Sequence, residues 1–148
     1  MKHSVQFLDV NNPREIERAF TVFTYLRPHL TAAKFCEQVP VQYAEGYRMI
    51  FLELDGIFAA GAGYRVLNFL AWGKVLYIDD LITHPEKKRK GLGGALLDWI
   101  IEEAKSLHCD EVHLDTGYGR HDAHRLYLNK GFKLATHHMS VQLSSKAP

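Results

Sequence analysis

Apolar positions recur every three or four residues in the first part of the chain, after a short β-rich run at residues 5–8. Pro13 stands where proline favours the first turn of a helix. We therefore expect a strand at 5–8 and a helix that opens at 11–13 and continues up to Pro28. The apolar positions that follow the helical spacing are Ile16, Ala19, Phe20, Phe23 and Leu26.

A second helix is expected over residues 31–39, because the same spacing returns there. Pro40 removes a backbone N–H and is predicted to break this helix, with a further turn at 41–44. Residues 47–54 and 57–65 are β-rich runs joined by Asp55 and Gly56, a dipeptide typical of a two-residue hairpin turn. The sequence therefore predicts an antiparallel pair whose register follows from that turn.

The segment 67–73 is expected to be a loop or an irregular strand end, in which Phe69 and Trp72 cover the edge of the sheet. Residues 75–83 read as the next strand, and a long amphipathic helix is expected over 92–107. Its apolar stripe consists of Leu92, Leu96, Leu97, Ile100, Ile101 and Ala104.

The last part of the chain predicts a strand at 111–116, a helix at 122–129 and a final strand or pair of strands at 132–143. Strands and helices are interspersed without repeats, low-complexity tracts or a linker. This order predicts a mixed α/β fold in which residues 1–148 form a single domain.

Composition limits the classes of function. With 148 residues, 47% of them hydrophobic, the chain can bury roughly 68–70% of its unfolded surface. It therefore needs no additional cross-link to be stable. Cys36 and Cys109 do not form a disulfide framework, and neither a signal peptide nor an apolar run of about 20 residues is present. A formal net charge of +1 disfavours a general nucleic-acid binder. We therefore expect a cytoplasmic protein with small-molecule partners and without a membrane partner.

A basic, glycine-rich run joins the strand expected at 75–83 to the helix expected at 92–107. Glycines let backbone N–H groups approach an anion, and the start of a helix adds unpaired donors and the positive end of a dipole. The run thus predicts a cradle for a diphosphate. Its residues are Lys87, Lys88, Arg89, Lys90, Gly91, Leu92, Gly93 and Gly94.

The spacing of the glycines excludes two common phosphate loops. The third glycine of the dinucleotide fingerprint is missing after Gly91 and Gly93, and no Lys-Ser or Lys-Thr follows as in a Walker loop. The pattern present is shorter: a basic residue, two residues, glycine, one residue, glycine, running from Lys88 to Gly93.

At this point the chain resembles the GNAT superfamily of N-acetyltransferases, whose signature is Arg or Gln, two residues, Gly, one residue, Gly or Ala. Lys88 departs from that signature and Arg89 follows it, which leaves open which side chain faces the phosphates. Residues 77–86 resemble the family's fourth strand and its lead into the pyrophosphate loop. Residues 123–132 resemble its closing motif, an Ala and a Tyr on a helix that ends in Gly-Phe.

The resemblance implies a three-layer arrangement, with a mixed central sheet splayed at the cofactor site and helices on both faces. It also implies acetyl-CoA as co-substrate, bound by the basic cradle and by main-chain groups of the strand before it, which can pair with the peptide-like pantetheine arm. The residues expected to bind it are Leu81, Ile82, Thr83, Lys88, Arg89, Lys90, Gly91, Leu92, Gly93 and Gly94.

Acetyl transfer to an amine needs a group that removes a proton from the amine and a group that protonates the departing thiolate. Tyr127 matches the family's general acid, and a phenol with a pKa of about 10 is protonated at neutral pH.

Asp79 and Asp80 are the candidates for the base or the amine-binding group. Successive strand residues point to opposite faces unless a bulge intervenes, so at least one should face the acceptor. Each aspartate can instead bind an arginine or the backbone, and Tyr127 can instead be a core aromatic.

The resulting prediction is an acetyl-CoA-dependent N-acetyltransferase that acts on a primary amine of a small molecule or peptide by direct transfer, since no cysteine lies in the motifs. One alternative is a catalytically silent CoA-binding sensor or regulatory module. Another is a nucleic-acid-binding module that uses the basic turn, although no aromatic residue interleaves with that turn to stack on bases.

The acceptor side is less defined by the sequence. In the resembling family, specificity resides in the amino-terminal helices and in a hairpin after the last helix, here residues 20–42 and 133–143. The sequence leaves open the identity of the amine, the acyl-chain preference and the oligomeric state, including whether the protein forms a homodimer. The side chains that either line the acceptor groove or pack are Tyr25, Arg27, His29, Tyr43 and Tyr47.

Nine histidines raise the question of a metal. His121 with His124 and the adjacent pair His137 and His138 lack a carboxylate or cysteine pattern typical of a metal site, so no metal is expected. Arg120 stands near the position of a family asparagine that contacts coenzyme, which leaves that contact open.

Overall fold

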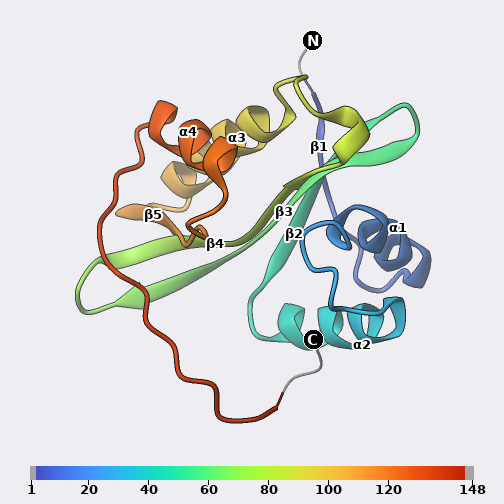
Figure 1. Cartoon of the computed structure of the whole chain (residues 1–148), viewed down its shortest axis with the longest axis horizontal. Helices are drawn as coiled ribbons and strands as arrows, with labels where there is room; N and C mark the ends of the chain where they lie inside the picture. The colour runs from blue at the N-terminus through green and yellow to red at the C-terminus, as the bar shows by residue number, and fades with distance from the viewer. Residues whose placement is uncertain (1–2, 146–148) are drawn as a thin grey trace.

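Five strands form one open mixed sheet in the computed structural model, which describes residues 3–145 (Figure 1). The spatial order of the strands follows the chain, and β4 and β5 are the one parallel pair of neighbours in this sheet. The strands are β1 (Val5–Phe7), β2 (Arg48–Leu54), β3 (Ile57–Phe69), β4 (Gly73–Thr83) and β5 (Glu111–Leu114).

Helices cover both faces of the sheet. The helices α1 (Pro13–Phe23) and α2 (Ala32–Ala44) lie on one face, and α3 (Leu92–Ser106) and α4 (His121–Asn129) lie on the other, with a 3-10 turn η1 (Pro85–Lys87) before α3 (Figure 1). This three-layer α/β arrangement confirms the predicted fold class. Within residues 3–145, no helix has both the length and the apolarity needed to cross a membrane.

The central strands are buried on both faces, which explains their continuous apolar runs. Met49 and Phe51 of β2 pack in the core under α1 and α2, whereas Ile50 and Leu52 pack in the core under α3. Of the stripe predicted for α3, the structure buries all positions except Ile101, which is half-buried. Alternate residues of one strand thus tie the two helical layers to the sheet.

The hairpin between β2 and β3 turns at Asp55 and Gly56, as predicted. Both residues have positive φ, 55° and 78°, which suits the primed turns that match the twist of antiparallel strands. Leu54 pairs with Ile57 directly across this turn.

The helix α1 is shorter than predicted. It begins after Asn12, whose side chain accepts from the Arg14 N–H, and it ends at Phe23 instead of continuing to Pro28. Beyond it the chain turns, since the N–H groups of Leu26 and Arg27 both bond to the Phe23 carbonyl. This turn directs Arg27 toward the sheet, where it pairs with the carboxylate of Asp80.

The prediction that Pro40 breaks the second helix was wrong. The helix α2 begins after Thr31, whose hydroxyl accepts from the Lys34 N–H, and runs through Pro40 to Ala44. Pro40 is exposed, so water can reach the carbonyl that lost its intrahelical donor.

The prediction of a loop or irregular strand end over residues 67–73 is confirmed only for the turn at residues 70–72 and was wrong for the rest of the segment. The strand β3 continues through Leu67 to Phe69, and β4 begins at Gly73, which pairs with Phe69. Packing of aromatic rings stabilises this long hairpin, with the centroids of Phe69 and Trp72 5.1 Å apart. Antiparallel ladder bonds between paired strands therefore prevailed over the weak local β pattern.

The final strand or pair predicted over 132–143 does not form in the described part of the chain. The segment that follows α4 is extended and runs along the β5 side of the molecule toward α2 (Figure 1). The hairpin expected at 133–143 from the family resemblance is thus absent from residues 3–145.

The two parallel strands separate partway along their length. The last paired residues are Ile78 and Leu114, whereas β4 continues to Thr83. Beyond Ile78 the backbone of β4 therefore has no strand on its β5 side within the described residues. This is the splay that the resemblance implied.

Gly61→Ala is expected to destabilise the fold. An alanine Cβ would lie 2.7 Å from Phe51 Cε1 and 2.8 Å from Phe23 Cε2, both in the core. Overpacking costs about 1–3 kcal/mol, more than the ~0.4–1 kcal/mol gained from a less flexible unfolded chain. Urea unfolding should therefore show a lower midpoint. The matched control is Gly119→Ala, where no atom lies within 4 Å of the added Cβ and no loss of stability is expected.

Candidate functional site

A cavity of about 480 Å³ lies where β4 and β5 separate. Its walls come from the turn after α1, from β4, from the segment after β5 and from α4. The lining residues are Tyr25, Leu26, Arg27, Ile78, Asp79, Asp80, Leu81, Ile82, Lys88, Leu114, Asp115, Gly117, Arg120 and Tyr127. Segments far apart in the chain therefore meet at one site.

Six of the thirteen residues predicted from the sequence for catalysis or coenzyme binding line this cavity. They are Asp79, Asp80, Leu81, Ile82, Lys88 and Tyr127. The other predicted coenzyme-binding residues do not line it. These are Thr83, Arg89, Lys90, Gly91, Leu92, Gly93 and Gly94. Of these, Leu92 is a core residue with 1% of its surface exposed, so only its backbone is available to a ligand.

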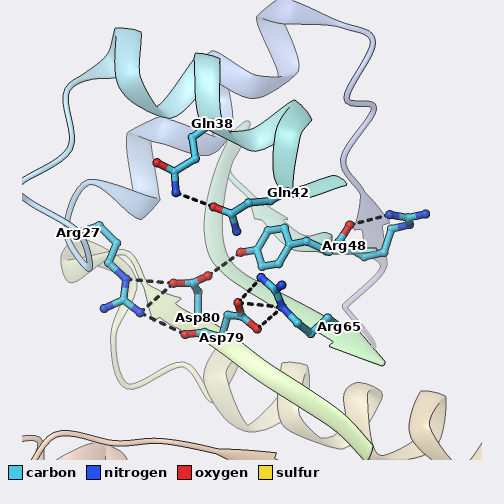
Figure 2. A network of polar contacts seen from close by, with 8 residues as sticks. Arg27, Gln38, Gln42, Arg48, Arg65, Asp79 and Asp80 are labelled. Atoms are coloured by element: carbon cyan, nitrogen blue, oxygen red, sulfur yellow. Dashed lines mark hydrogen bonds and ion pairs between the residues drawn. The ribbon is translucent and has the colours of Figure 1, made fainter. Parts of the chain in front are cut away.

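A β-bulge places both aspartates on one side of the sheet. In the pairing of β3 with β4, Gly63 lies opposite Asp80 and Tyr64 lies opposite Ile78, so Asp79 has no partner of its own. The extra residue shifts the alternation of side chains by one position. The two carboxylates consequently point into the same polar network rather than to opposite faces (Figure 2).

Asp80 is held by two side chains from other elements. The Tyr47 hydroxyl donates to its Oδ2 at 2.6 Å, and Arg27 Nε donates to its Oδ1 at 3.0 Å (Figure 2). Gly63 is required for this arrangement, because a Cβ there would overlap the Tyr47 hydroxyl. Arg27 also donates to the Asp79 carbonyl at 3.1 Å, so the turn after α1 is anchored to β4 at two points.

Asp79 is paired with Arg65. Arg65 Nη2 donates to Asp79 Oδ2 at 2.6 Å and its Nε lies 3.1 Å from both carboxylate oxygens, with each side chain 23% exposed. The guanidinium also lies 5.5 Å from the centroid of the Tyr47 ring. Arg65 was missed from the sequence, because it is the pairing of β3 with β4 that places it across from Tyr77, two residues before Asp79.

The surroundings shift the proton affinities of this network. Burial raises the pKa of Asp79 above its ordinary value, and the hydrogen bonds and charge of Arg65 oppose that rise. Burial and then the charge of Asp80 raise the pKa of Tyr47 well above 10. Tyr47 is therefore a hydrogen-bond donor at neutral pH, and Asp79 is a more basic carboxylate than an exposed aspartate.

Tyr127 lines the cavity from α4. Only 6% of its surface is exposed, and its ring centroid lies 5.9 Å from that of Phe132. Burial raises its pKa, and the charge of Arg120 partly opposes this. Tyr127 is thus both a core aromatic and a protonated phenol beside the cavity, so the two interpretations made from the sequence are compatible.

The start of α3 presents open backbone next to this cavity. Its N-cap is Gly91 at φ 73°, and no side chain of the described residues caps the helix. The first N–H groups of an uncapped helix point outward and favour anions. Lys88 lines the cavity, whereas Lys87 pairs with Asp55 at 2.8 Å.

Of the residues considered for the acceptor groove, Tyr25 and Arg27 line the cavity and Tyr47 reaches it through Asp80. His29 and Tyr43 do not line it. Tyr43 has a packing role, because its hydroxyl accepts from the Met49 N–H at 2.9 Å.

Several lining residues were not singled out from the sequence. They are Leu26, Ile78, Leu114, Asp115 and Gly117. Only the splay brings these apolar, acidic and glycine positions together, and no local motif marks them.

Within residues 3–145, no three or more His, Cys, Asp or Glu side chains lie close enough to hold a metal ion. His138 contacts Asp115 at 3.2 Å, and His121 packs against His124 with ring centroids 6.2 Å apart. The expectation of a site without a metal stays a prediction.

Comparison with known proteins gives a family match over most of the chain. The model of the acetyltransferase (GNAT) family matches residues 11–132. An uncharacterized N-acetyltransferase of Bacillus subtilis, YhdJ, is 25% identical over 135 residues, which cover 90% of this chain and 95% of that protein. An aminoalkylphosphonate N-acetyltransferase of Salmonella typhimurium is 38% identical over 56 residues, which cover 38% of this chain and only 36% of that protein.

Solved structures share the fold at low sequence identity. An aminoglycoside N-acetyltransferase, AAC(6')-Iy, solved in complex with CoA, superposes with a TM-score of 0.79 at 12% identity. The superposition covers 94% of this chain and 93% of that one. At this identity the similarity concerns the fold alone.

Arg65→Gln is expected to raise the pKa of Asp79 further, because it removes the interactions that oppose burial. The free energy of unfolding at neutral pH should fall by about 1–3 kcal/mol, since a half-buried carboxylate loses its partner. The folded state binds the Asp79 proton more tightly than the unfolded state does. Stability therefore falls as the pH rises from 3.8, the ordinary pKa of aspartate, through the raised pKa of the folded state. This pH range should be wider in the variant.

Carbon-13 NMR titration of the aspartate carboxyls, together with urea unfolding at several pH values, measures both effects. Lys105→Gln is the matched control, because it breaks an exposed ion pair with Glu102 and should change stability by no more than about 0.5 kcal/mol. A carboxyl of Asp79 that titrates at or below 3.8 in the unmodified protein would contradict the assignment.

Proposed function

Because the chain belongs to the acetyltransferase (GNAT) family, we propose that it transfers an acetyl group from acetyl-CoA directly to a primary amine. The observation that carries the proposal is the cavity at the splay of β4 and β5. It brings Asp79 and Asp80 together with Tyr127, next to the open start of α3. A group that accepts a proton and a group that donates one are thus available at a single site.

The backbone around the cavity fits the chemistry of acetyl-CoA. The uncapped N-terminus of α3 and the side chain of Lys88 suit a diphosphate. The part of β4 beyond Ile78 has an open edge, which suits the amide groups of pantetheine. The CoA complex of the aminoglycoside N-acetyltransferase, whose fold is similar, supports the same co-substrate.

In this proposal, the backbone from Leu81 to Thr83 binds the pantetheine arm and the backbone from Gly91 to Gly94 binds the diphosphate. Lys88, Arg89 and Lys90 supply positive charge to the phosphates. Bound acetyl-CoA supplies a thioester whose carbonyl carbon the acceptor nitrogen attacks.

We assign the proton acceptor to Asp79, acting through a water molecule. Its raised pKa makes it a stronger base than an exposed aspartate, while Arg65 keeps it oriented. Asp80 is bonded to Tyr47 and Arg27, and it helps to bind the ammonium form of the acceptor and to hold the turn after α1. In the proposed reaction, a C–N bond forms, the C–S bond breaks, and the proton of the amine passes toward Asp79.

We assign the proton donor to Tyr127. Its raised pKa keeps the phenol protonated at neutral pH, so its hydroxyl can donate to the thiolate as the C–S bond breaks. The phenol comes from α4 and the two carboxylates come from β4, so proton removal and proton delivery are assigned to different elements. Transfer then occurs without a covalent acyl-enzyme.

The acceptor class in this proposal is a primary amine of a small molecule or peptide. The similarity to an aminoalkylphosphonate N-acetyltransferase over 56 residues supports an amine acceptor, and the cavity wall carries the carboxylates of Asp79, Asp80 and Asp115, which can contact an ammonium group. A cytoplasmic location, a metal-free site and no nucleic-acid or membrane partner stay predictions from the sequence.

The experiment that tests the proposal is an acetyl-transfer assay. The protein is incubated with acetyl-CoA and a panel of amines, thiol release is followed, and mass spectrometry detects an acetyl group on the amine. Acetylated product is expected. If calorimetry showed CoA binding but no amine in the panel were acetylated, the alternative of a silent CoA-binding sensor would be favoured.

Tyr127→Phe should lower kcat by about 10²-fold or more while leaving the affinity for CoA nearly unchanged, because it removes a proton donor and keeps the ring in the core. Steady-state kinetics and calorimetry measure the two quantities. Tyr118→Phe is the matched control, since this tyrosine is 88% exposed and does not line the cavity. Equal turnover of the two variants would remove the assigned role of Tyr127.

Gly93→Leu should abolish CoA binding, because a side chain at the start of α3 would occupy the space that a diphosphate needs. A Cβ there already lies 3.3 Å from Leu126 Cδ2. Calorimetry with CoA measures the loss, and circular dichroism checks that the fold is kept. Gly119→Leu, at an open position outside the cavity lining, should bind CoA normally. Undiminished CoA affinity of Gly93→Leu would contradict the proposed cradle.

A further inference from the structure

The carboxylates that line the cavity already have basic partners within the chain. A carboxylate with a basic partner attracts a further cation less strongly than a free carboxylate does. An acceptor recognised through its ammonium group alone would therefore gain little at this wall. The pairs are Asp79 with Arg65 at 2.6 Å, Asp80 with Arg27 at 2.9 Å and Asp115 with His138 at 3.2 Å.

Two basic side chains of the same lining are without an acidic partner. Lys88 and Arg120 are exposed, and no ion pair joins either of them to an acidic side chain within residues 3–145. The charge of Arg120 reaches the proposed proton donor, because it opposes the rise that burial causes in the pKa of Tyr127. Lys88 is assigned to the diphosphate in the proposed function. Arg120 then remains available for a second anion.

Arg27 offers part of its guanidinium to a ligand. Its Nε and Nη2 hold the Asp80 carboxylate and the Asp79 carbonyl, whereas its Nη1 has no hydrogen-bond partner in the part of the chain that the structure describes (Figure 2). The side chain is 42% exposed and lines the cavity. Because the contacts with β4 fix the plane of the guanidinium, the two N–H groups of Nη1 are preorganised to bind an anion.

Arg27 and Asp80 present opposite charges side by side on one wall. Arg27 Nη2 lies 2.9 Å from Asp80 Oδ1, and 13% of the Asp80 side chain is exposed. Its carboxylate accepts from Tyr47 and Arg27, which leaves some of its about four lone-pair sites for a ligand. A molecule whose amine and acid group are joined by a short chain can lie along this pair with its charges in the opposite order. Both of its charges are then paired.

We propose that the acceptor is a small amine that also carries an acid group, bound with its ammonium at Asp80 and its anion at Arg27 and Arg120. The inference rests on the proposed acetyl transfer and names the substrate class of that site. The anion is a carboxylate or a phosphonate, since a guanidinium suits the oxygens of both.

This orientation places the amine beside the proposed proton acceptor. Asp79 and Asp80 are adjacent on β4, and their carboxylates lie in one polar network (Figure 2). A nitrogen held at Asp80 is therefore close to a water molecule bound to Asp79. The cavity of about 480 Å³ also has to hold the thioester end of the coenzyme, so the acceptor is small.

The test compares acceptors that differ in the acid group. Glycine, β-alanine and aminoethylphosphonate carry an amine and an acid. Glycinamide and β-alaninamide replace the carboxylate with a neutral amide, and diaminopropane replaces it with a second cation. Thiol release measures kcat/KM for each. The best acid should exceed the amides and the diamine by at least about 10-fold, because they lack the charged hydrogen bond to the guanidinium. Comparison of the acids identifies the anion as a carboxylate or a phosphonate.

The outcomes separate this inference from the proposed function. A protein that acetylates the amides or the diamine as fast as the acids, or only amines without an acid group, overturns the inference and leaves acetyl transfer in place. A protein that acetylates no amine overturns both.

Substitutions locate the anion. Arg27→Gln should lower the ratio of kcat/KM between the best acid and the best amide by about 10-fold. Arg27 also anchors the turn after α1, and loss of that anchor lowers kcat/KM for both acceptors, so the ratio is the readout. Arg27→Lys keeps a cation and should retain more of the ratio. An unchanged ratio in Arg27→Gln overturns the assignment of the anion to this side chain.

Arg120→Gln removes the second cation at an exposed position and should lower the same ratio by about 3-fold or more. An unchanged ratio would exclude Arg120 from the anion site. Arg125→Gln is the matched control, because this arginine is 75% exposed, pairs with Asp122 and does not line the cavity. A ratio that falls as far in Arg125→Gln as in Arg27→Gln would reveal a general effect of charge and overturn binding at Arg27.

Discussion

The pairing of β4 with its two neighbours is the constraint on which the site depends. On one side, β4 pairs with β3 along nearly its whole length. On the other, it pairs with β5 only as far as Ile78. Backbone groups beyond that point face the cavity instead of a strand. A sheet that stayed paired to the end would leave neither a cavity nor an open edge for a peptide-like ligand.

The second consequence of this pairing is electrostatic. The bulge at Asp79 brings two carboxylates to one side of the sheet, which is unfavourable unless cations accompany them. Arg27 and Arg65 supply that charge from the turn after α1 and from β3. The same contacts that offset the cost of burying the carboxylates also fix the position of the turn at the cavity wall. Stability and site geometry therefore rest on the same ion pairs.

Much of the fold could be predicted from the chain alone, because it depends on local signals. Asp55 and Gly56 set the hairpin, Asn12 and Pro13 the start of α1, and the glycine-rich run the start of α3. The errors came where local and tertiary preferences conflict. Pro40 was accommodated because its position is exposed, and the long β3–β4 hairpin turns at residues 70–72, none of which is a typical turn residue.

The candidate site, like the fold, could be predicted only in part from the sequence. The residues proposed for acetyl transfer, Asp79, Asp80 and Tyr127, could be singled out from the order of motifs along the chain. The role of Arg65, the common side of the two aspartates and the unpaired segment after α4 emerged only from the folded chain. Each depends on strand register, and register results from contacts between residues far apart in sequence, which no local pattern encodes. The sequence by itself thus determined which chemical groups are present, and the tertiary structure decided which of them meet.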